Sequence, residues 1–317
     1  MSEQTITIRR SILLGVACGV GAGAFWGTVF LAPKVLAGFS PFELTVARYL
    51  VYGLVSALLL APRWQKVTSA ITRTEWMALV RLSLLGNIVY YIFVAAAVQL
   101  GGVAVASLIV GLLPVLVTLL GSRDHGALPL RHLAAPLTII ALGIVLINAD
   151  LFGAAPSGDP LLKAVGVACA VVALFSWGFY AVHNSRWLAR VHHVSSQDWS
   201  LLTGIVTGAL ALALAVPVFA LGQSHSGHDW LVFWGFNLVL AVGASVIGNA
   251  LWNTASRLLP LTLSGQMIIF ETLFALLYGF IWEQRLPRPL ELMAIAALVI
   301  GVSWSARLHQ VHAEPKP

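Results

Sequence analysis

Long apolar stretches separated by short polar segments dominate this chain of 317 residues. A helix that crosses the hydrocarbon layer of a bilayer needs about 20 mainly apolar residues. The apolar residues run on continuously instead of alternating with a period of two, which favours membrane helices over the strands of a β-barrel. We therefore predict ten transmembrane helices, over residues 11–32, 41–62, 75–97, 102–121, 131–149, 161–183, 197–221, 229–253, 260–282 and 288–307.

The first predicted helix recurs in the second half of the chain. Over the sixteen residues 15–30, eight match the residue found 151 positions later, and the pair Trp26-Gly27 returns as Trp177-Gly178. A weaker match pairs Gly86-Asn87 with Gly248-Asn249 at a slightly larger offset. The pattern indicates an internal duplication with loops of changed length.

The duplication divides the chain into two sets of five predicted helices. Residues 1–150 form the first set and residues 151–317 the second, joined by a segment at 150–160 that is rich in Gly, Pro and Asp. Because five is odd, the second repeat should be inverted relative to the first, which is a common plan in secondary transporters. We expect an all-α integral membrane protein in which the two repeats surround a central cavity.

Composition and charge agree with this picture. Hydrophobic residues make up 59% of the chain and charged residues 9%, against roughly 25% charged residues in a soluble domain. With the N-terminus in the cytoplasm, twelve Lys and Arg lie on the inner side and four on the outer side, a bias that predicts both termini in the cytoplasm. This arrangement fits a multi-pass protein of the bacterial inner membrane and explains the net charge of +6 without a nucleic-acid partner.

Glu271 is the deepest acidic residue in the predicted helices. If its helix enters the membrane near Pro260, Glu271 lies about 16 Å along it, near the middle of a hydrocarbon layer of about 30 Å. An ionised carboxylate at that depth should face the interior of the bundle, pair with a cation or be protonated. The pattern leaves three roles open: a proton-coupling group, a counter-ion for a substrate ammonium group, or a structural carboxyl group.

Two other residues are candidates for mechanism. Arg48 lies about 10 Å from the outer end of its helix, and it either meets a substrate carboxylate, pairs with Glu271 or reaches the lipid headgroups. Glu43, nearer the same end, is expected to reach water. Pro114 removes a backbone hydrogen bond in the middle of its helix and is expected to act as a kink or hinge.

Aromatic and amide side chains gather at matched depths in both repeats. Such a mixture suits a pocket for a small amphipathic molecule, whereas each residue alone is equally compatible with packing between helices. The predicted substrate-binding residues are Trp26, Asn87, Tyr90, Tyr91, Trp177, Tyr180, Asn249, Trp252, Asn253 and Gln266.

Other residues are predicted to be structural. Glycines at 15, 19, 23 and 27 form a smooth strip for close helix packing. Trp199 is one of several tryptophans near predicted helix ends that are interpreted as interfacial anchors. Cys18 and Cys169 are expected to be free packing residues. The sequence carries no metalloprotease or serine-hydrolase motif and no P-loop, so we expect no metal, no cofactor and no enzymatic activity.

These features together resemble the EamA family of the drug/metabolite transporter superfamily. The resemblance rests on the two Trp-Gly pairs, on Pro41 followed by Arg48, on Leu113-Pro114, and on Glu283 before the last predicted helix. Within that family the chain is most similar to the YddG-type exporters of aromatic amino acids. The resemblance implies a basket of helices around a central cavity and efflux by alternating access. It also implies Pro where this chain has Glu271.

The sequence therefore predicts an exporter of amino acids, aromatic and other, and of related small metabolites. Its expected partners are the small-molecule substrate, the lipid bilayer and, as a candidate coupling ion, protons; the chain is expected to be a monomer or a weak homodimer. An exporter of cationic drugs or other metabolites is the alternative. An intramembrane enzyme or a lipid-binding scaffold is a third interpretation, for which no convergent set of catalytic residues is found.

Overall fold

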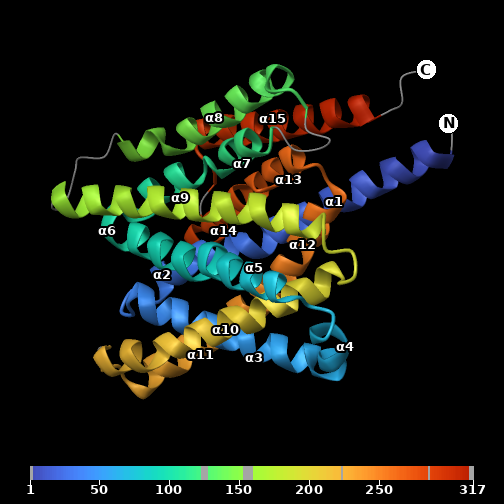
Figure 1. Ribbon diagram of the computed structural model, residues 1–317. Coiled ribbons are helices and arrows are strands. Elements are labelled where there is room, and N and C mark those ends of the chain that lie inside the picture. Colours follow the sequence, from blue (N-terminus) through green and yellow to red (C-terminus); the bar gives the residue numbers. More distant parts are fainter. Residues whose placement is uncertain (1–2, 123–127, 153–159, 223, 285, 314–317) are drawn as a thin grey trace.

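The computed structural model describes residues 3–122, 128–152, 160–222, 224–284 and 286–313, and these residues form helices without any strand (Figure 1). The first half of the chain contains α1 (Glu3–Gly27), η1 (Thr28–Leu31), α2 (Ala32–Val35), α3 (Pro41–Leu60), η2 (Ala61–Arg63), α4 (Trp64–Thr68), α5 (Arg73–Ser83), η3 (Leu84–Val89), α6 (Tyr90–Val110), α7 (Leu113–Gly121) and α8 (Leu130–Phe152). The second half contains α9 (Pro160–Leu188), α10 (Ser196–Leu221), α11 (Gly227–Leu240), η4 (Ala241–Gly248), α12 (Asn249–Leu258), α13 (Leu261–Met267), α14 (Ile269–Glu283) and α15 (Pro289–Ala313).

Seven helical segments of the described chain are long and apolar enough to cross a membrane, and two shorter apolar helices occupy 130–143 and 289–305. The all-helical membrane architecture predicted from the apolar pattern is confirmed. These nine segments coincide with nine of the ten predicted helices. The exception is the predicted helix 102–121, which corresponds to the end of α6 and to α7.

The predicted boundary between the third and fourth helices was wrong. A loop was expected at residues 98–101, but α6 continues through this segment as far as Val110, and the interruption falls at Gly111 and Leu112. A glycine in a helix costs only about 1 kcal/mol relative to alanine. Here Gly101 lies directly against Gly166 of α9, so a close helix contact compensates for it.

Several helices begin at capping boxes, which explains where they start. The side chain of Ser40 accepts a hydrogen bond from the backbone N–H of Glu43, and the Glu43 carboxylate accepts one from the Ser40 N–H. Thr72 with Glu75 and Ser226 with Asp229 repeat the arrangement. Such a cap stabilises a helix by about 1 kcal/mol. It also keeps Glu43 buried, contrary to the expectation that this residue reaches water.

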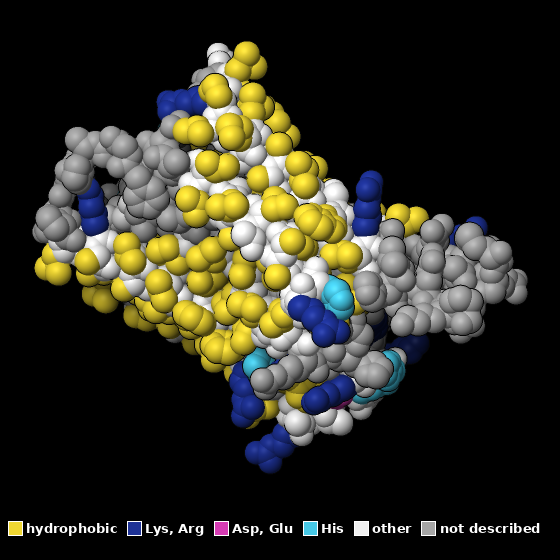
Figure 2. Space-filling view, turned by 90° about the horizontal axis from the view of Figure 1, so that it is seen from above, with side chains coloured by type: hydrophobic (Ala, Val, Ile, Leu, Met, Phe, Trp, Pro, Cys, Tyr) yellow, Lys and Arg dark blue, Asp and Glu magenta, His cyan; other side chains and the backbone are white. Residues whose placement is uncertain are grey.

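The helices lie in one elongated bundle (Figure 1). α3, α10 and α11 form one flank, α8 and α15 pack together on the opposite flank, and α1, α6, α9 and α12–α14 lie between them. The start of α1 and the end of α15 are at the same end of the bundle. Hydrophobic side chains cover most of the face seen in Figure 2, as expected for a surface that contacts lipid tails.

Glycines set the closest helix contacts. A Cβ atom added at Gly23 would lie 2.6 Å from Cβ of Phe270 and 2.8 Å from the backbone nitrogen of Glu271. The glycine strip of α1 therefore packs against α12–α14, as the small-residue pattern predicted. A second crossing joins α3 and α10, where a Cβ on Gly53 would lie 2.6 Å from Cα of Gly208.

Four helical irregularities surround the middle of the bundle. η3 and η4 are π-helical segments, a geometry that is rare and often found at functional sites. Two other helical paths are broken, at Gly111–Leu112 between α6 and α7 and at Ile268 between α13 and α14. These breaks and π-segments position most of the predicted site residues.

Candidate functional site

Three tryptophans from different helices meet in the middle of the bundle. Trp26 of α1, Trp177 of α9 and Trp252 of α12 have pairwise ring-centroid distances of 5.4 to 5.6 Å. Tyr180 and Tyr90 extend the group, at 5.6 and 6.3 Å from the Trp177 ring. The predicted aromatic residues are thus brought together. Their rings pack on one another, at separations typical of favourable aromatic pairs.

The π-helical segments hold this aromatic group in place. The indole Nε1 of Trp26 donates a 3.0 Å hydrogen bond to the carbonyl oxygen of Ala244 in η4. In the other half, the hydroxyl of Ser176 on α9 donates a 2.7 Å bond to the carbonyl oxygen of Leu85 in η3. α1 and α9, the two helices that carry a Trp-Gly pair, thus each donate a side-chain hydrogen bond to a π-segment: α1 to η4 and α9 to η3.

A glycine in each π-segment makes room for an aromatic ring. Gly86 in η3 lies against the ring of Tyr180. A Cβ atom added at Gly248 in η4 would lie 2.8 Å from Nε1 of Trp26. Any larger side chain at either glycine would collide with a site residue. The Gly-Asn pairs noted in the sequence thus mark contacts of the π-segments with the aromatic group.

Arg48 is buried on α3 and does not reach the lipid headgroups. Its side chain is 5% exposed, and its Nε donates a 3.0 Å hydrogen bond to the hydroxyl of Ser245 in η4. Its guanidinium carbon lies 4.6 Å from the centroid of the Tyr91 ring and 5.3 Å from that of Tyr49. Cation–π contacts in desolvated surroundings stabilise a buried cation by about 2 kcal/mol.

Glu271 lies in the first turn of α14, directly after the break at Ile268. The side chain is 7% exposed, and no described residue forms a hydrogen bond or an ion pair with its carboxylate. Arg48, the other deeply buried charge of the predicted site, forms no ion pair with it in the described chain. The N-terminal end of a helix favours negative charge, so α14 partly compensates this carboxylate.

Several buried polar atoms near the helix breaks and the π-segments have no hydrogen-bond partner among the residues that the structure describes. They are both amide atoms of Gln266, Nε1 of Trp252 and the hydroxyl oxygen of Tyr91. An unsatisfied buried polar group costs about 1–3 kcal/mol. Such groups are therefore candidates for binding water or a ligand.

The three predicted asparagines are all hydrogen-bonded to neighbouring helices. Asn87 donates to the hydroxyl of Thr207 at 2.9 Å, and Asn249 donates to the hydroxyl of Tyr52 at 3.3 Å. Oδ1 of Asn253 accepts a 2.7 Å bond from the amide of Asn184. These amides therefore join helices in this conformation.

Asn253 belongs to a network at the end of the bundle that the charge pattern assigns to the cytoplasm. Trp199 donates from its Nε1 to Oδ1 of Asn184 at 3.0 Å. Arg257 donates to the carbonyl oxygens of Val191 and Val194 at 3.0 to 3.1 Å. Trp199 is fully buried, so its interpretation as an interfacial anchor was wrong. No spacing in the sequence points to Asn184 as the partner of its indole.

Pro114 is the second residue of α7 and not the centre of a continuous helix. Proline is well tolerated in a first turn because the N–H groups there have no helical partner. The interruption lies two to three residues before Pro114, at Gly111–Leu112. Pro114 and Glu271 thus both lie in the first turn of a helix that follows a break.

Residues for metal or thiol chemistry are not brought together in the described chain. No group of three or more His, Cys, Asp or Glu side chains lies close enough there to hold a metal ion. Cys18 and Cys169 are free thiols.

Comparisons with known proteins place the chain in a family. The model of the EamA-like transporter family matches residues 13–149. The inner membrane protein YtfF of Escherichia coli (strain K12) is 32% identical over 311 residues, which cover 93% of this chain and 96% of that protein. A protein of known crystal structure shares the fold with a TM-score of 0.70 at 22% identity, over 95% of this chain and 99% of the other. The chain belongs to the EamA-like transporter family.

Proposed function

We propose that this protein exports amino acids and related small amphipathic metabolites across the bacterial inner membrane by alternating access. The observation that carries the proposal is the presence of two buried opposite charges, Arg48 and Glu271, that are not paired with each other. Buried charges in membrane helices are costly and usually serve function. A zwitterion has one group for each of them.

The contacts of each charge suggest how a zwitterion binds. Arg48 uses Nε for Ser245 and its face for Tyr91. A substrate carboxylate would bind its terminal guanidinium nitrogens, in the bidentate geometry that Arg favours. Glu271 has no described partner and is the natural acceptor for an ammonium group.

The aromatic group supports a preference for apolar or aromatic side chains. Trp26, Trp177 and Trp252 contact one another in this conformation, so a substrate would separate them and take over part of their contacts. The unpartnered amide of Gln266 and the indole Nε1 of Trp252 then provide hydrogen bonds. This mixture of apolar surface and few polar groups is typical of small-molecule sites.

Contacts that recur in both halves support two inverted five-helix repeats, residues 1–150 and 151–317. The contact of Gly53 with Gly208 is reciprocal, since each added Cβ meets the other's Cα. An added Cβ at Gly143 meets Leu298, and one at Gly301 meets Ile140. Residues 140 and 143 therefore correspond to residues 298 and 301 at one common offset of 158 positions. A twofold arrangement produces such self-complementary contacts.

The second candidate function is export of organic cations. It is favoured by one observation: Arg48 is already stabilised by Ser245 and two tyrosine rings, whereas Glu271 alone lacks a described partner. In that case Arg48 serves structure and only the ammonium group of the substrate is recognised.

Counterflow of labelled phenylalanine into proteoliposomes tests both candidates. For a zwitterion site, unlabelled phenylalanine competes, whereas phenethylamine, which lacks the carboxylate, and hydrocinnamate, which lacks the ammonium group, do not. For a cation site, phenethylamine competes at least as well as phenylalanine. Glu271→Gln should lower counterflow by about tenfold or more, the value of a lost charged hydrogen bond, and Glu271→Asp should restore part of it.

Two results would contradict the proposal. One is counterflow by the Glu271→Gln protein equal to that of the wild type. The other is the absence of competition by any of the three compounds. Repeating the assay with an imposed pH gradient shows whether protons drive the exchange.

A further inference from the structure

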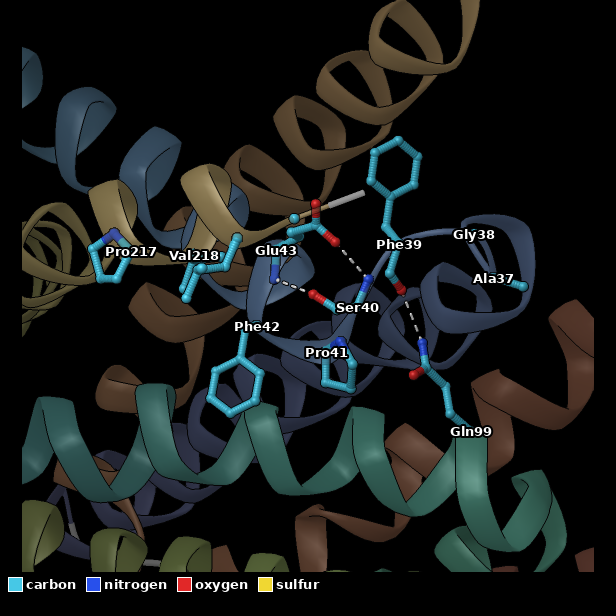
Figure 3. Close-up of a pocket in the computed structure, with 12 residues that line it drawn as sticks. Ala37, Gly38, Phe39, Ser40, Pro41, Phe42, Glu43, Gln99, Pro217 and Val218 are labelled. Carbon is cyan, nitrogen blue, oxygen red and sulfur yellow. Dashed lines mark hydrogen bonds between the residues drawn. The ribbon is translucent and has the colours of Figure 1, made fainter. Parts of the chain in front are cut away.

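A groove opens at the end of the bundle opposite the Asn184 network, on the side that the charge pattern assigns to the outside. It has a volume of about 550 Å³ and lies between residues 37–43, which lead into α3, and the last residues of α10 (Figure 3). Gln99 of α6 completes it and donates a 3.0 Å hydrogen bond to the carbonyl oxygen of Phe39. Its lining is mainly apolar, with Glu43 as the charged residue.

Glu43 has a second buried neighbour that can carry charge. Its Oε1 lies 3.9 Å from Nε2 of His225, and the two side chains are 3% and 10% exposed. Neither atom has a hydrogen-bond partner, and 3.9 Å is too long for a hydrogen bond. A buried carboxylate oxygen and a buried imidazole nitrogen thus face each other without a bond.

Both groups are held by contacts that do not involve the other. Oε2 of Glu43 accepts a 2.8 Å hydrogen bond from the N–H of Ser40 at the start of α3. The His225 ring stacks on Phe39 at 3.9 Å and meets the edge of Trp230 at 5.4 Å. The imidazole therefore cannot easily turn away from the carboxylate.

Gly222 keeps the space beside Glu43 open. A Cβ atom at this position would lie 2.5 Å from Oε1 of Glu43. The backbone of Gly222 has φ −66° and ψ 164°, an extended conformation that any residue adopts. A larger side chain at this position would therefore displace the Glu43 carboxylate, while the chain conformation itself does not call for glycine.

We propose that Glu43 and His225 form a proton-binding site on the outer face. When His225 takes up a proton from the outer solution, Nε2 becomes a donor and forms a charged hydrogen bond with Oε1 of Glu43. Closing the 3.9 Å gap draws the start of α11 toward the start of α3 and narrows the adjoining groove. Loss of the proton returns the pair to the separation seen here.

Few other ionisable groups face this pair in the described chain. Asp229 on α11 is held by Ser226 through its Oδ2, at 2.7 and 3.1 Å. His228 lies on α11 beside Asp229. In the described chain the carboxylate within 4.0 Å of Nε2 of His225 is that of Glu43 and not that of Asp229, so Glu43 is the nearer acceptor.

Cysteine labelling tests the site without depending on transport. Both native cysteines are first removed, by Cys18→Ala and Cys169→Ala. The rate of labelling at Val218→Cys then reports how accessible the groove is. The rate at Ser69→Cys, which is exposed at the opposite end of the bundle, corrects for the pH dependence of thiol reactivity. The labelling ratio of position 218 to position 69 should fall by about threefold or more between pH 8 and 5, the range in which imidazole changes charge.

His225→Gln and Gly222→Ala should each abolish this change, the first by removing the proton site and the second by displacing the carboxylate. A ratio that does not vary with pH in the parent protein, or one that still varies after His225→Gln, would overturn the proposal. The proton site bears on the proposed export function because it would place proton control on the outer side. The labelling assay tests the proton site and the counterflow assay tests export. A negative result in one does not predict a negative result in the other, so the two proposals can be separated.

Discussion

At the scale of single residues, Arg48 shows how a cation is accommodated inside a membrane protein. Among the described residues no carboxylate forms an ion pair with it; a serine hydroxyl and the faces of two tyrosines contact it instead. Arg is suited to this environment because its guanidinium group is planar and weakly hydrated, whereas the Lys ammonium group is compact and strongly hydrated. The two residues are therefore not equivalent at this position.

We expect Arg48→Lys to raise the half-saturation concentration for phenylalanine by about 10- to 30-fold, from the loss of cation–π and bidentate contacts worth about 2 kcal/mol. Ser245→Ala is the matched control. It removes one hydrogen bond, which contributes about 1 kcal/mol, and should raise the same constant by about fivefold. Equal constants in wild type and Arg48→Lys would show that Arg48 does not contact the substrate.

At the scale of helices, close packing of α1 against α14 sets the position of Glu271. Gly23 faces the backbone at Phe270 and Glu271, where an added Cβ would lie 2.6 to 2.8 Å from atoms that include the Glu271 nitrogen. Backbone atoms cannot move aside as the end of a flexible side chain does. The carboxylate is thus held by the glycine strip as well as by its own helix.

Gly23→Ala should therefore lower the thermal stability of the purified protein, since overpacking costs about 1–3 kcal/mol, and should reduce counterflow. Gly21→Ala is the control on the same helix, because its Cβ would meet only the side chain of Leu251, at 3.1 Å. Its melting temperature and transport should stay close to those of the wild type. Equal losses in both variants would argue against a specific role for the α1–α14 contact.

The helices were largely predictable from the sequence, and their irregularities were not. Continuous apolar runs located nine predicted helices because burial in lipid requires them. The π-segments η3 and η4 instead depend on distant partners: the indole of Trp26 bonds to Ala244, and the hydroxyl of Ser176 bonds to Leu85. The same holds for α6, which continues through Gly101 because Gly166 packs against it.

The candidate site was predictable in composition and less so in geometry. The aromatic residues were expected to line a cavity and are found in contact with one another. Asn87 and Asn249 bond to Thr207 and Tyr52, partners that no sequence spacing indicates. Depth along a helix can be read from the sequence, but the neighbour that a polar group meets depends on how the helices pack.

At the scale of the whole molecule, the two ends of the bundle differ. The end assigned to the cytoplasm is held by the hydrogen bond between Asn184 and Asn253 and by the ion pair of Arg63 with Asp198, at 3.1 Å. The imidazole of His193 also lies 3.4 Å from the Glu75 carboxylate there. The end assigned to the outside has a groove and the unbonded Glu43 and His225. The proposed export by alternating access would require the cytoplasmic contacts to open, because in that proposal the substrate enters from the cytoplasmic side.

Locking the cytoplasmic end should therefore stop transport. In a protein without Cys18 and Cys169, we expect a short thiol cross-linker to join Asn184→Cys to Asn253→Cys and to reduce counterflow by at least about tenfold, with recovery after cleavage of the linker. The single-cysteine variants treated in the same way should keep their activity, which separates the cross-link from modification of either residue. Because α9 and α12 both contribute to the tryptophan group, a bridge between them also prevents Trp177 and Trp252 from separating. Transport that continues in the cross-linked protein would mean that substrate reaches the site by a path that leaves these two helices together.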